Sequence, residues 1–152
     1  MVFVNGQTIR QAREAAGLSQ SELAVRSGVA QPNISAYESG VRHPSPKMVG
    51  RLVSAARPRP SAVLAANRDA VLALAEANKA VDVRVFGSIA RDMDTPDSDI
   101  DILVRFRDGA SLLDQSNLAI ELGQLLGVHV DVVSEGGLRD GHHGIRRDAV
   151  PL

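Results

Sequence analysis

The sequence predicts two small domains: an all-α bundle over residues 1–56, then an α/β (α+β) domain with a small mixed sheet flanked by helices over residues 62–152. Two prolines within residues 57–61 interrupt any continuous helix, which predicts a linker there. Before the linker, short helical segments are separated by glycines; after it, helical and strand patterns alternate. Residues 1–60 hold eight Lys and Arg against three Glu, whereas residues 61–152 hold nine against fifteen acidic residues. The two halves are therefore expected to have different partners.

The composition limits the kinds of protein this chain can be. Cysteine is absent from its 152 residues, which excludes a disulfide framework and a thiolate metal site and is typical of a cytoplasmic protein. No apolar run approaches the roughly 18 residues of a membrane span, so no membrane is expected as a partner. With one Tyr, three Phe and no Trp, the core must be aliphatic.

Local signals place four helices in the front half, over residues 8–16, 19–27, 31–38 and 46–56. Ser19 and Glu22 have the spacing of a capping box, which starts the second helix. Gly17 and Gly28 end the first and second helices. The predicted core of this half is Leu23, Ala24, Val29 and Ile34, with Leu18 and Leu52 from the flanking helices.

The back half reads as alternating helices and strands. The predicted elements are a helix over 61–79, a strand over 81–86, a short helix after Gly87-Ser88, a strand over 99–106, a helix over 110–126, a strand over 128–133 and a short helix around Ile145.

Two predicted strands carry aspartates within apolar runs. On the strand over 99–106, Asp99 and Asp101 point to one face and the isoleucines between and after them to the other. Asp131 repeats this arrangement on the next strand. Such carboxylates would repel one another unless a cation lies between them, and oxygen ligands without Cys or paired His indicate Mg²⁺ or Mn²⁺. An exposed edge-strand face is the alternative for the first pair. A calcium loop of the EF-hand kind is excluded, because Ile102 stands where its sharp turn needs Gly.

Gly87-Ser88 lies between a predicted strand and a predicted helix, where a phosphate group can be held. Gly permits close backbone approach, and the start of a helix offers free N–H groups. Taken alone, such a pair is more often only a turn. Arg91, one helical turn after Ser88, could add positive charge to bound phosphates or form a surface salt bridge.

The pattern Gly87-Ser88, ten residues, Asp99-Ile100-Asp101, then Asp131 resembles the nucleotidyltransferase superfamily that includes DNA polymerase beta. It is most similar to the minimal nucleotidyltransferase branch, over about residues 61–152. The resemblance implies that Asp99 and Asp101 hold two Mg²⁺ ions, and that Asp131 binds the second ion and helps to activate an acceptor hydroxyl. It also implies that Gly87 and Ser88 grip the β- and γ-phosphates of a nucleotide such as ATP. Two such cations stabilise the attacking and leaving oxygens of an in-line displacement.

The front half has the helix, glycine turn and helix spacing of a helix-turn-helix. The stretch GLSQSELAVRSGVAQPNISAYESGVRHPS resembles the lambda-repressor-like (Cro-type) family over residues 6–56. The resemblance implies that the helix from Gln31 enters the major groove and that a dimer binds a palindromic operator. Ala30 and Pro32 depart from the family pattern and predict a weakly capped helix. The residues expected to contact DNA are Gln20, Gln31, Asn33, Ser35, Arg42 and Lys47.

Together these resemblances suggest a self-regulating antitoxin. The back half has no room for a substrate-binding subdomain, so its acceptor is expected to be another macromolecule. Minimal nucleotidyltransferases often pair with HEPN-type toxins, which suggests AMP transfer from ATP to a toxin encoded by the neighbouring gene. Two alternatives remain open. One is a transcription regulator whose second domain only senses nucleotide, and the other is an enzyme that modifies a small molecule such as an aminoglycoside. A bundle used for protein contact is the alternative for the front half.

Overall fold

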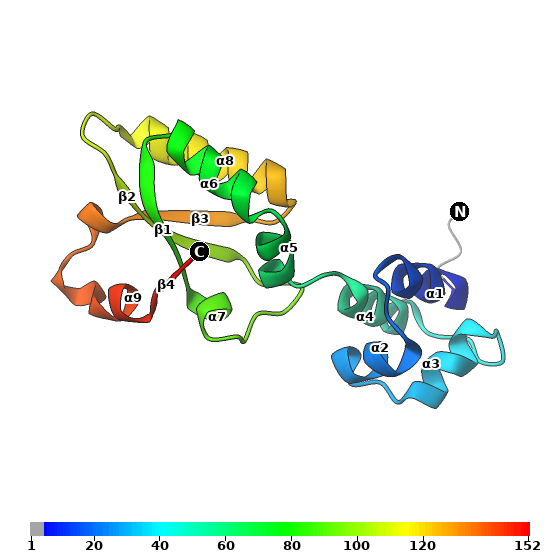
Figure 1. The fold of residues 1–152 in the computed structure, drawn as a ribbon. Helices are drawn as coiled ribbons and strands as arrows, with labels where there is room; N and C mark the ends of the chain where they lie inside the picture. The colour runs from blue at the N-terminus through cyan, green and yellow to red at the C-terminus, as the bar shows by residue number, and fades with distance from the viewer. Residues whose placement is uncertain (1–4) are drawn as a thin grey trace. The chain divides into compact units, whose positions relative to one another are not determined.

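The computed structural model describes residues 5–152, with the side chain of residue 140 excepted. The chain divides into two compact units, Met1–Pro58 and Arg59–Leu152, each with its own apolar core (Figure 1). Within the described residues, no helix is long and apolar enough to cross a membrane.

The first unit is a bundle of helices whose ends follow the local sequence signals. Its elements are α1 (Gly6–Ala15), α2 (Gln20–Ser27), α3 (Gln31–Glu38) and α4 (Pro46–Ala56). The predicted capping box is present: Ser19 Oγ accepts a hydrogen bond from the Glu22 N–H, and the Glu22 carboxylate accepts one from the Ser19 N–H. Helix α1 begins two residues earlier than predicted, because the Asn5 side chain accepts from the Gln7 N–H and caps it.

A nearly buried ion pair joins the helices of the first unit. Glu38 of α3 is 5% exposed, and Arg13 of α1 donates to its two carboxylate oxygens over 2.7 and 2.8 Å. Gln20 of α2 donates to the same carboxylate over 2.9 Å. Burial, the largest single influence, raises the pKa of Glu38, but the hydrogen bonds from Arg13 and Gln20 outweigh it and leave the pKa below its ordinary value. Around this pair, the buried apolar core is Ile9, Leu18, Leu23, Val29, Ile34, Val49, Leu52 and Ala56.

The second unit is built on a mixed sheet, as predicted, and the sheet has four strands. Its elements are α5 (Pro60–Ala66), α6 (Arg68–Ala77), β1 (Ala80–Phe86), α7 (Gly87–Ala90), β2 (Ile100–Phe106), α8 (Leu112–Leu126), β3 (Val130–Ser134), the 3₁₀ turns η1 (Glu135–Gly137) and η2 (Asp140–His142), α9 (His143–Asp148) and β4 (Val150–Pro151). The strand order is β3-β2-β1-β4. Strands β2 and β3 are parallel, and β1 is antiparallel to both β2 and β4.

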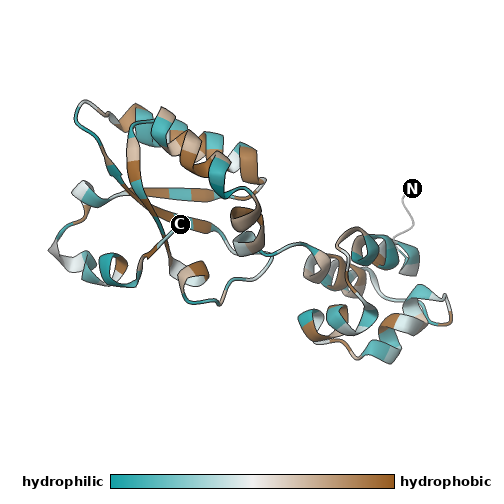
Figure 2. Ribbon diagram, in the orientation of Figure 1, coloured by the Kyte–Doolittle hydropathy of each residue, from teal (hydrophilic) through white to brown (hydrophobic). Residues whose placement is uncertain are grey.

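Helices α6 and α8 cover one face of this sheet (Figure 1). Ile100, Ile102 and Val104 of β2 are completely buried in the core on this side, together with Val130 and Val132 of β3. Hydrophobic residues accordingly line the inner sides of the helices and strands (Figure 2). Because side chains alternate along a strand, the aspartates of β2 and β3 are left on the opposite face.

The single helix predicted over residues 61–79 is two helices. Asn67 leaves the helical conformation, with φ −113° and ψ 17°, and its side-chain amide donates to the Val63 carbonyl over 2.8 Å. This local hydrogen bond competes with the continuing helix. Pro60, which was expected in the linker, is the first residue of α5, where a proline costs no hydrogen bond.

The register of β1 also differs from the simple alternation that was predicted. Asp82 has φ +53°, and the pairing of β1 with β2 shifts between Val81 and Arg84. This bulge leaves Val81 half-buried while Val83 and Val85 are buried.

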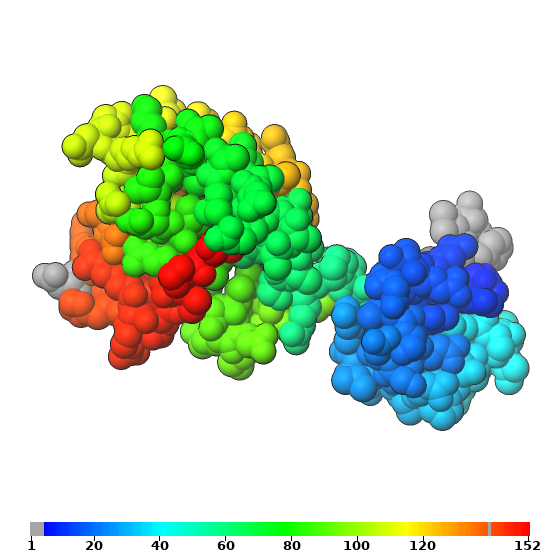
Figure 3. Space-filling model, in the orientation of Figure 1, coloured from blue at the N-terminus to red at the C-terminus, as the bar shows by residue number. Residues whose placement is uncertain are grey.

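The C-terminal tail, whose role the sequence did not indicate, becomes part of the second unit. Helix α9 forms around Ile145 as predicted and packs against α7. Strand β4 was not predicted; it pairs with β1, and the Leu152 N–H donates to the Val83 carbonyl over 3.0 Å. In the space-filling view the red residues of α9 lie on the surface of the same unit, next to the green residues of α7 (Figure 3).

Candidate active site

The parallel pairing of β2 and β3 brings the predicted aspartates together. Asp101 and Asp131 are register partners on the two strands. One step earlier, the Ile100 N–H donates to the His129 carbonyl over 3.0 Å, which places residue 129 beside the start of β2. Asp99 immediately precedes β2 and has the same phase as Asp101. The three predicted aspartates therefore gather where both strands begin, on the face away from α6 and α8.

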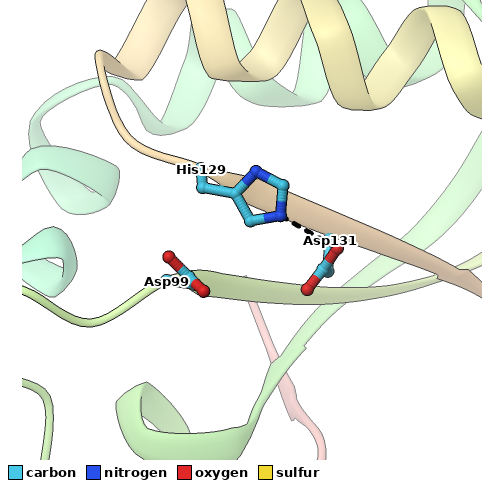
Figure 4. A group of neighbouring side chains, drawn as sticks. All are labelled: Asp99, His129 and Asp131. Atoms are coloured by element: carbon cyan, nitrogen blue, oxygen red, sulfur yellow. Dashed lines mark ion pairs between the residues drawn. The ribbon is translucent and has the colours of Figure 1, made fainter.

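The tightest group at this position includes a histidine that sequence reasoning missed. Asp99, His129 and Asp131 are exposed, and each offers one ligand atom within 4.8 Å of the others. In Figure 4 the imidazole points along the strands toward Asp131, and Asp99 lies on the neighbouring strand end. His129 Nε2 lies 3.2 Å from Asp131 Oδ1. The signal that could have identified His129 is its position two residues before Asp131, which puts both side chains on one face of a strand.

Asp101 is the partly buried member of the site and lies against the Gly87 turn. Its partner across the antiparallel pair with β1 is Phe86, and a Cβ built on Gly87 would overlap Asp101 Oδ2. Burial first, and then the charges of Asp131 and Asp99, raise the pKa of Asp101 above its ordinary value. Ionising Asp101 is therefore costly, because its carboxylate is partly buried and lies near two other carboxylates.

Of the predicted phosphate-binding residues, Gly87 lies directly against Asp101, and Ser88 and Arg91 follow it along the chain. Gly87 has φ +69° and opens the one-turn helix α7, and the half-buried Ser88 follows it. The carbonyl of Ser88 accepts from the Met93 N–H over 2.8 Å, which closes the turn after α7. Arg91 is exposed, and its charge is close enough to lower the pKa of Asp101, although by less than burial and the aspartates raise it.

These residues fit a divalent cation. Two exposed carboxylates and one imidazole nitrogen converge in one place, with a third carboxylate as their immediate neighbour. Without a cation the three carboxylates repel one another, and carboxylate oxygens are the ligands that Mg²⁺ and Mn²⁺ prefer. The arrangement can therefore hold a metal ion beside a glycine turn that is open to phosphate groups.

In the first unit, the residues predicted to contact DNA lie on α2 and α3, in the loop after α3 and at the start of α4. Gln31 donates to Gln20 over 2.9 Å, which links the first turns of α2 and α3. Arg42 donates to Asn33 over 3.1 Å, Ser35 is half-buried on α3, and Lys47 is exposed in the first turn of α4. As expected from Ala30 and Pro32, α3 has no side-chain cap. The DNA contacts themselves stay a prediction.

Comparisons with known proteins follow the same division. Residues 9–56 match the helix-turn-helix family model, and residues 68–150 match the nucleotidyltransferase domain model. A Methanocaldococcus jannaschii protein named "Putative protein adenylyltransferase" is 42% identical over 66 residues, which are 43% of this chain and 67% of the relative. A protein adenylyltransferase of Thermococcus cleftensis is 43% identical over 60 residues, which are 40% of this chain and 61% of the relative.

A solved structure described as "Structure of putative minimal nucleotidyltransferase" is 48% identical, with a TM-score of 0.56. The match covers 60% of this chain and 95% of that one. The nucleotidyltransferase model alone matches more than half of the chain, and the helix-turn-helix match precedes it without overlap. The chain therefore belongs to the nucleotidyltransferase family and carries a helix-turn-helix domain ahead of its nucleotidyltransferase domain.

Proposed function

We propose that this protein transfers AMP from ATP to a hydroxyl group of a partner protein, and that its helix-turn-helix domain binds the operator of its own gene. The observation that carries the transfer is the pairing of Asp101 with Asp131 in adjacent parallel strands, with the Asp101 carboxylate against the Gly87 turn. The relatives named protein adenylyltransferases support a protein acceptor. Because the proposed role uses ATP and operator DNA, we expect the protein to act in the cytoplasm.

The proposed reaction forms a bond between the acceptor oxygen and the α-phosphorus and breaks the bond from that phosphorus to the bridging oxygen. Pyrophosphate leaves with the bond electrons. Gly87 and Ser88 bind the β- and γ-phosphates, because a residue without Cβ lets the backbone approach them closely. Arg91, exposed beside them, adds positive charge. Asp131 is 58% exposed and can accept the proton of the acceptor hydroxyl.

Asp99, Asp101 and Asp131 are the residues that would hold the divalent cations. Mg²⁺ or Mn²⁺ bound there supplies charge stabilisation for the attacking and leaving oxygens. Because Asp101 and Asp131 face each other across two strands of a sheet, their spacing is fixed by the ladder and not by mobile loops.

The partner that best fits this role is a HEPN-type toxin encoded by the neighbouring gene. The second unit is small, and Asp99, His129 and Asp131 of its candidate site are exposed. An acceptor carried by a folded protein would supply the missing walls of the site. A helix-turn-helix domain in the same chain would then couple modification of the partner to control of the shared operon.

The transfer is tested with ATP radiolabelled at the α-phosphate, the purified chain, Mg²⁺ or Mn²⁺ and the neighbouring gene product. Label on the partner is expected with α-labelled ATP and not with γ-labelled ATP, because the γ-phosphate leaves in pyrophosphate. Asp101→Asn and Asp131→Asn should abolish labelling. Asp108→Asn, an exposed acid beyond the far end of β2, is the matched control and should label normally. A partner that binds the chain but stays unlabelled would contradict the proposed transfer.

The second half of the proposal is tested with DNA from upstream of the gene. The full chain should bind as a dimer to two half-sites about 34 Å apart, or a multiple of that distance. Fluorescence anisotropy with labelled duplexes, together with footprinting, measures the affinity and the spacing. Equal affinity for the operator and for a scrambled duplex at physiological salt would contradict operator recognition. A change in operator affinity on adding ATP, without any labelling of a partner, would instead favour a nucleotide sensor.

A further inference from the structure

A histidine lies among the aspartates of the candidate site. His129 is 67% exposed, and its side chain lies at the start of the strands beside Asp131 (Figure 4). The backbone of His129 is held in place because its carbonyl accepts a hydrogen bond from the Ile100 N–H of β2. From there Nε2 reaches 3.2 Å from Asp131 Oδ1, and a ligand oxygen of Asp99 completes the group (Figure 4).

The spacing of these atoms suits direct coordination. In an octahedral ion with bonds of about 2.1 Å, neighbouring ligand atoms are about 3 Å apart and opposite ones about 4 Å apart. Ligand atoms that all lie within 4.8 Å of one another need only small side-chain rotations to reach those separations. All three side chains are exposed, so such rotations cost little.

We infer that His129 is a direct nitrogen ligand and that the site consequently prefers a first-row transition ion, with Mn²⁺ as the natural match, over Mg²⁺. Mg²⁺ gives up its water reluctantly and is bound mainly by oxygen, so an imidazole adds little to its affinity. Mn²⁺ shares with Mg²⁺ the preference for carboxylate oxygens, and as a first-row transition ion it also forms bonds to imidazole nitrogen, which the later ions of the row bind more tightly still. The inference rests on the proposed function only in taking Asp99 and Asp131 as residues that hold a cation.

The test is Mn²⁺ binding to the full-length protein, with and without ATP. Electron paramagnetic resonance of free Mn²⁺ measures affinity, and electron spin echo modulation detects a coordinated imidazole nitrogen directly. Nitrogen modulation is expected in the wild type and in His43→Ala, which removes an exposed histidine of the other unit. It should be absent in His129→Ala, with an affinity for Mn²⁺ about tenfold lower or more.

A second variant separates loss of a ligand from loss of structure. His129→Asp offers an oxygen at the same place, so it should keep Mn²⁺ bound without nitrogen modulation. Mg²⁺ should displace Mn²⁺ more easily from this variant than from the wild type. The Mg²⁺ concentration that displaces half of the bound Mn²⁺ should be about tenfold lower or more in His129→Asp. Bound Mn²⁺ without nitrogen modulation in the wild type, or modulation that persists in His129→Ala, would overturn the inference alone. Absence of any Mn²⁺ binding would remove both the inference and the metal site of the proposed transferase.

Discussion

The carboxylate of Asp101 occupies the space that a side chain at Gly87 would need. Gly87 has φ +69°, and a Cβ placed on it would overlap Asp101 Oδ2. The glycine is therefore required twice, once by its backbone conformation and once by the carboxylate that lies against it. This contact joins the turn predicted to hold phosphate to the strand predicted to hold the metal.

Gly87→Ala is expected to reduce nucleotidyl transfer by about a hundredfold or more, because a displaced catalytic group loses its alignment. Gly109→Ala is the matched control, since Gly109 also has a left-handed φ of +81° but has open space where a Cβ would go. Both variants carry the same kind of backbone strain, of order 1 kcal/mol. Equal losses of activity in the two variants would show that strain, and not the contact with Asp101, is responsible.

Removing the charge of Asp101 is expected to stabilise the metal-free protein at neutral pH. The pKa of Asp101 is raised in the fold by burial and by Asp131 and Asp99, so its contribution to stability is complete below the unfolded-state pKa and is lost as the pH rises through the folded-state pKa. In chelator, Asp101→Asn should therefore slow hydrogen exchange of the β2 amides at pH 7, with the gain disappearing toward about pH 4.

With Mn²⁺ or Mg²⁺ present, the β2 amides should exchange more slowly in the wild type than in Asp101→Asn, because the bound ion stabilises the charged carboxylate of the wild type. Asp108→Asn, which removes an exposed charge on a turn, should not change β2 exchange under either condition. A wild type that exchanges as slowly as Asp101→Asn in chelator at pH 7 would contradict the predicted repulsion.

Arg13→Ala is expected to destabilise the first unit by about 3 kcal/mol, because it leaves the Glu38 carboxylate buried without its partner. Tyr37 is the one tyrosine of a chain without tryptophan and packs against this core, so its fluorescence during urea unfolding reports on the first unit. Arg10→Ala removes an exposed i,i+4 pair with Glu14 and should have a much smaller effect. Similar midpoints for the two variants would contradict the importance of the buried pair.

The pH dependence of the first unit should follow Glu38. Its pKa is lowered in the fold, so the stability that it contributes is present above the unfolded-state pKa and is lost as the pH falls through the folded-state value. The tyrosine-monitored midpoint should therefore fall below about pH 4 in the wild type. In Glu38→Gln the urea midpoint should be lower than in the wild type at neutral pH, and it should change less on acidification.

Two DNA-binding residues should respond differently to substitution. Lys47→Ala should weaken binding to operator and scrambled DNA alike and reduce the slope of log affinity against log salt by about 1. Asn33→Ala should cost about 1–3 kcal/mol on the operator and little on scrambled DNA, because an amide reads base edges. Anisotropy titrations at several salt concentrations measure both. If Asn33→Ala weakened binding to operator and scrambled DNA equally, Asn33 would not contact a base, and the base contacts would have to come from other residues of α3.

Local sequence was sufficient where short-range hydrogen bonds decide the structure. Ser19 and Glu22 form their capping box within three residues, and Gly28 ends α2 with φ +68°, so the helices of the first unit could be placed before any tertiary contact was known. The same holds for the orientation of β2, because alternation alone puts Asp99 and Asp101 opposite Ile100 and Ile102. A short pattern also sufficed to suggest both families.

Only the tertiary structure decided which residues meet. The pairing of β2 with β3 sets His129 beside Asp99, and no periodicity within either strand contains that register. The pairing of β4 with β1 is likewise a tertiary effect. The free edge of β1 offers backbone hydrogen-bonding groups, and β4 pairs with it through only two residues. Residues close in sequence fix their own geometry, whereas strand neighbours are chosen by burial of the whole sheet, which no local segment encodes.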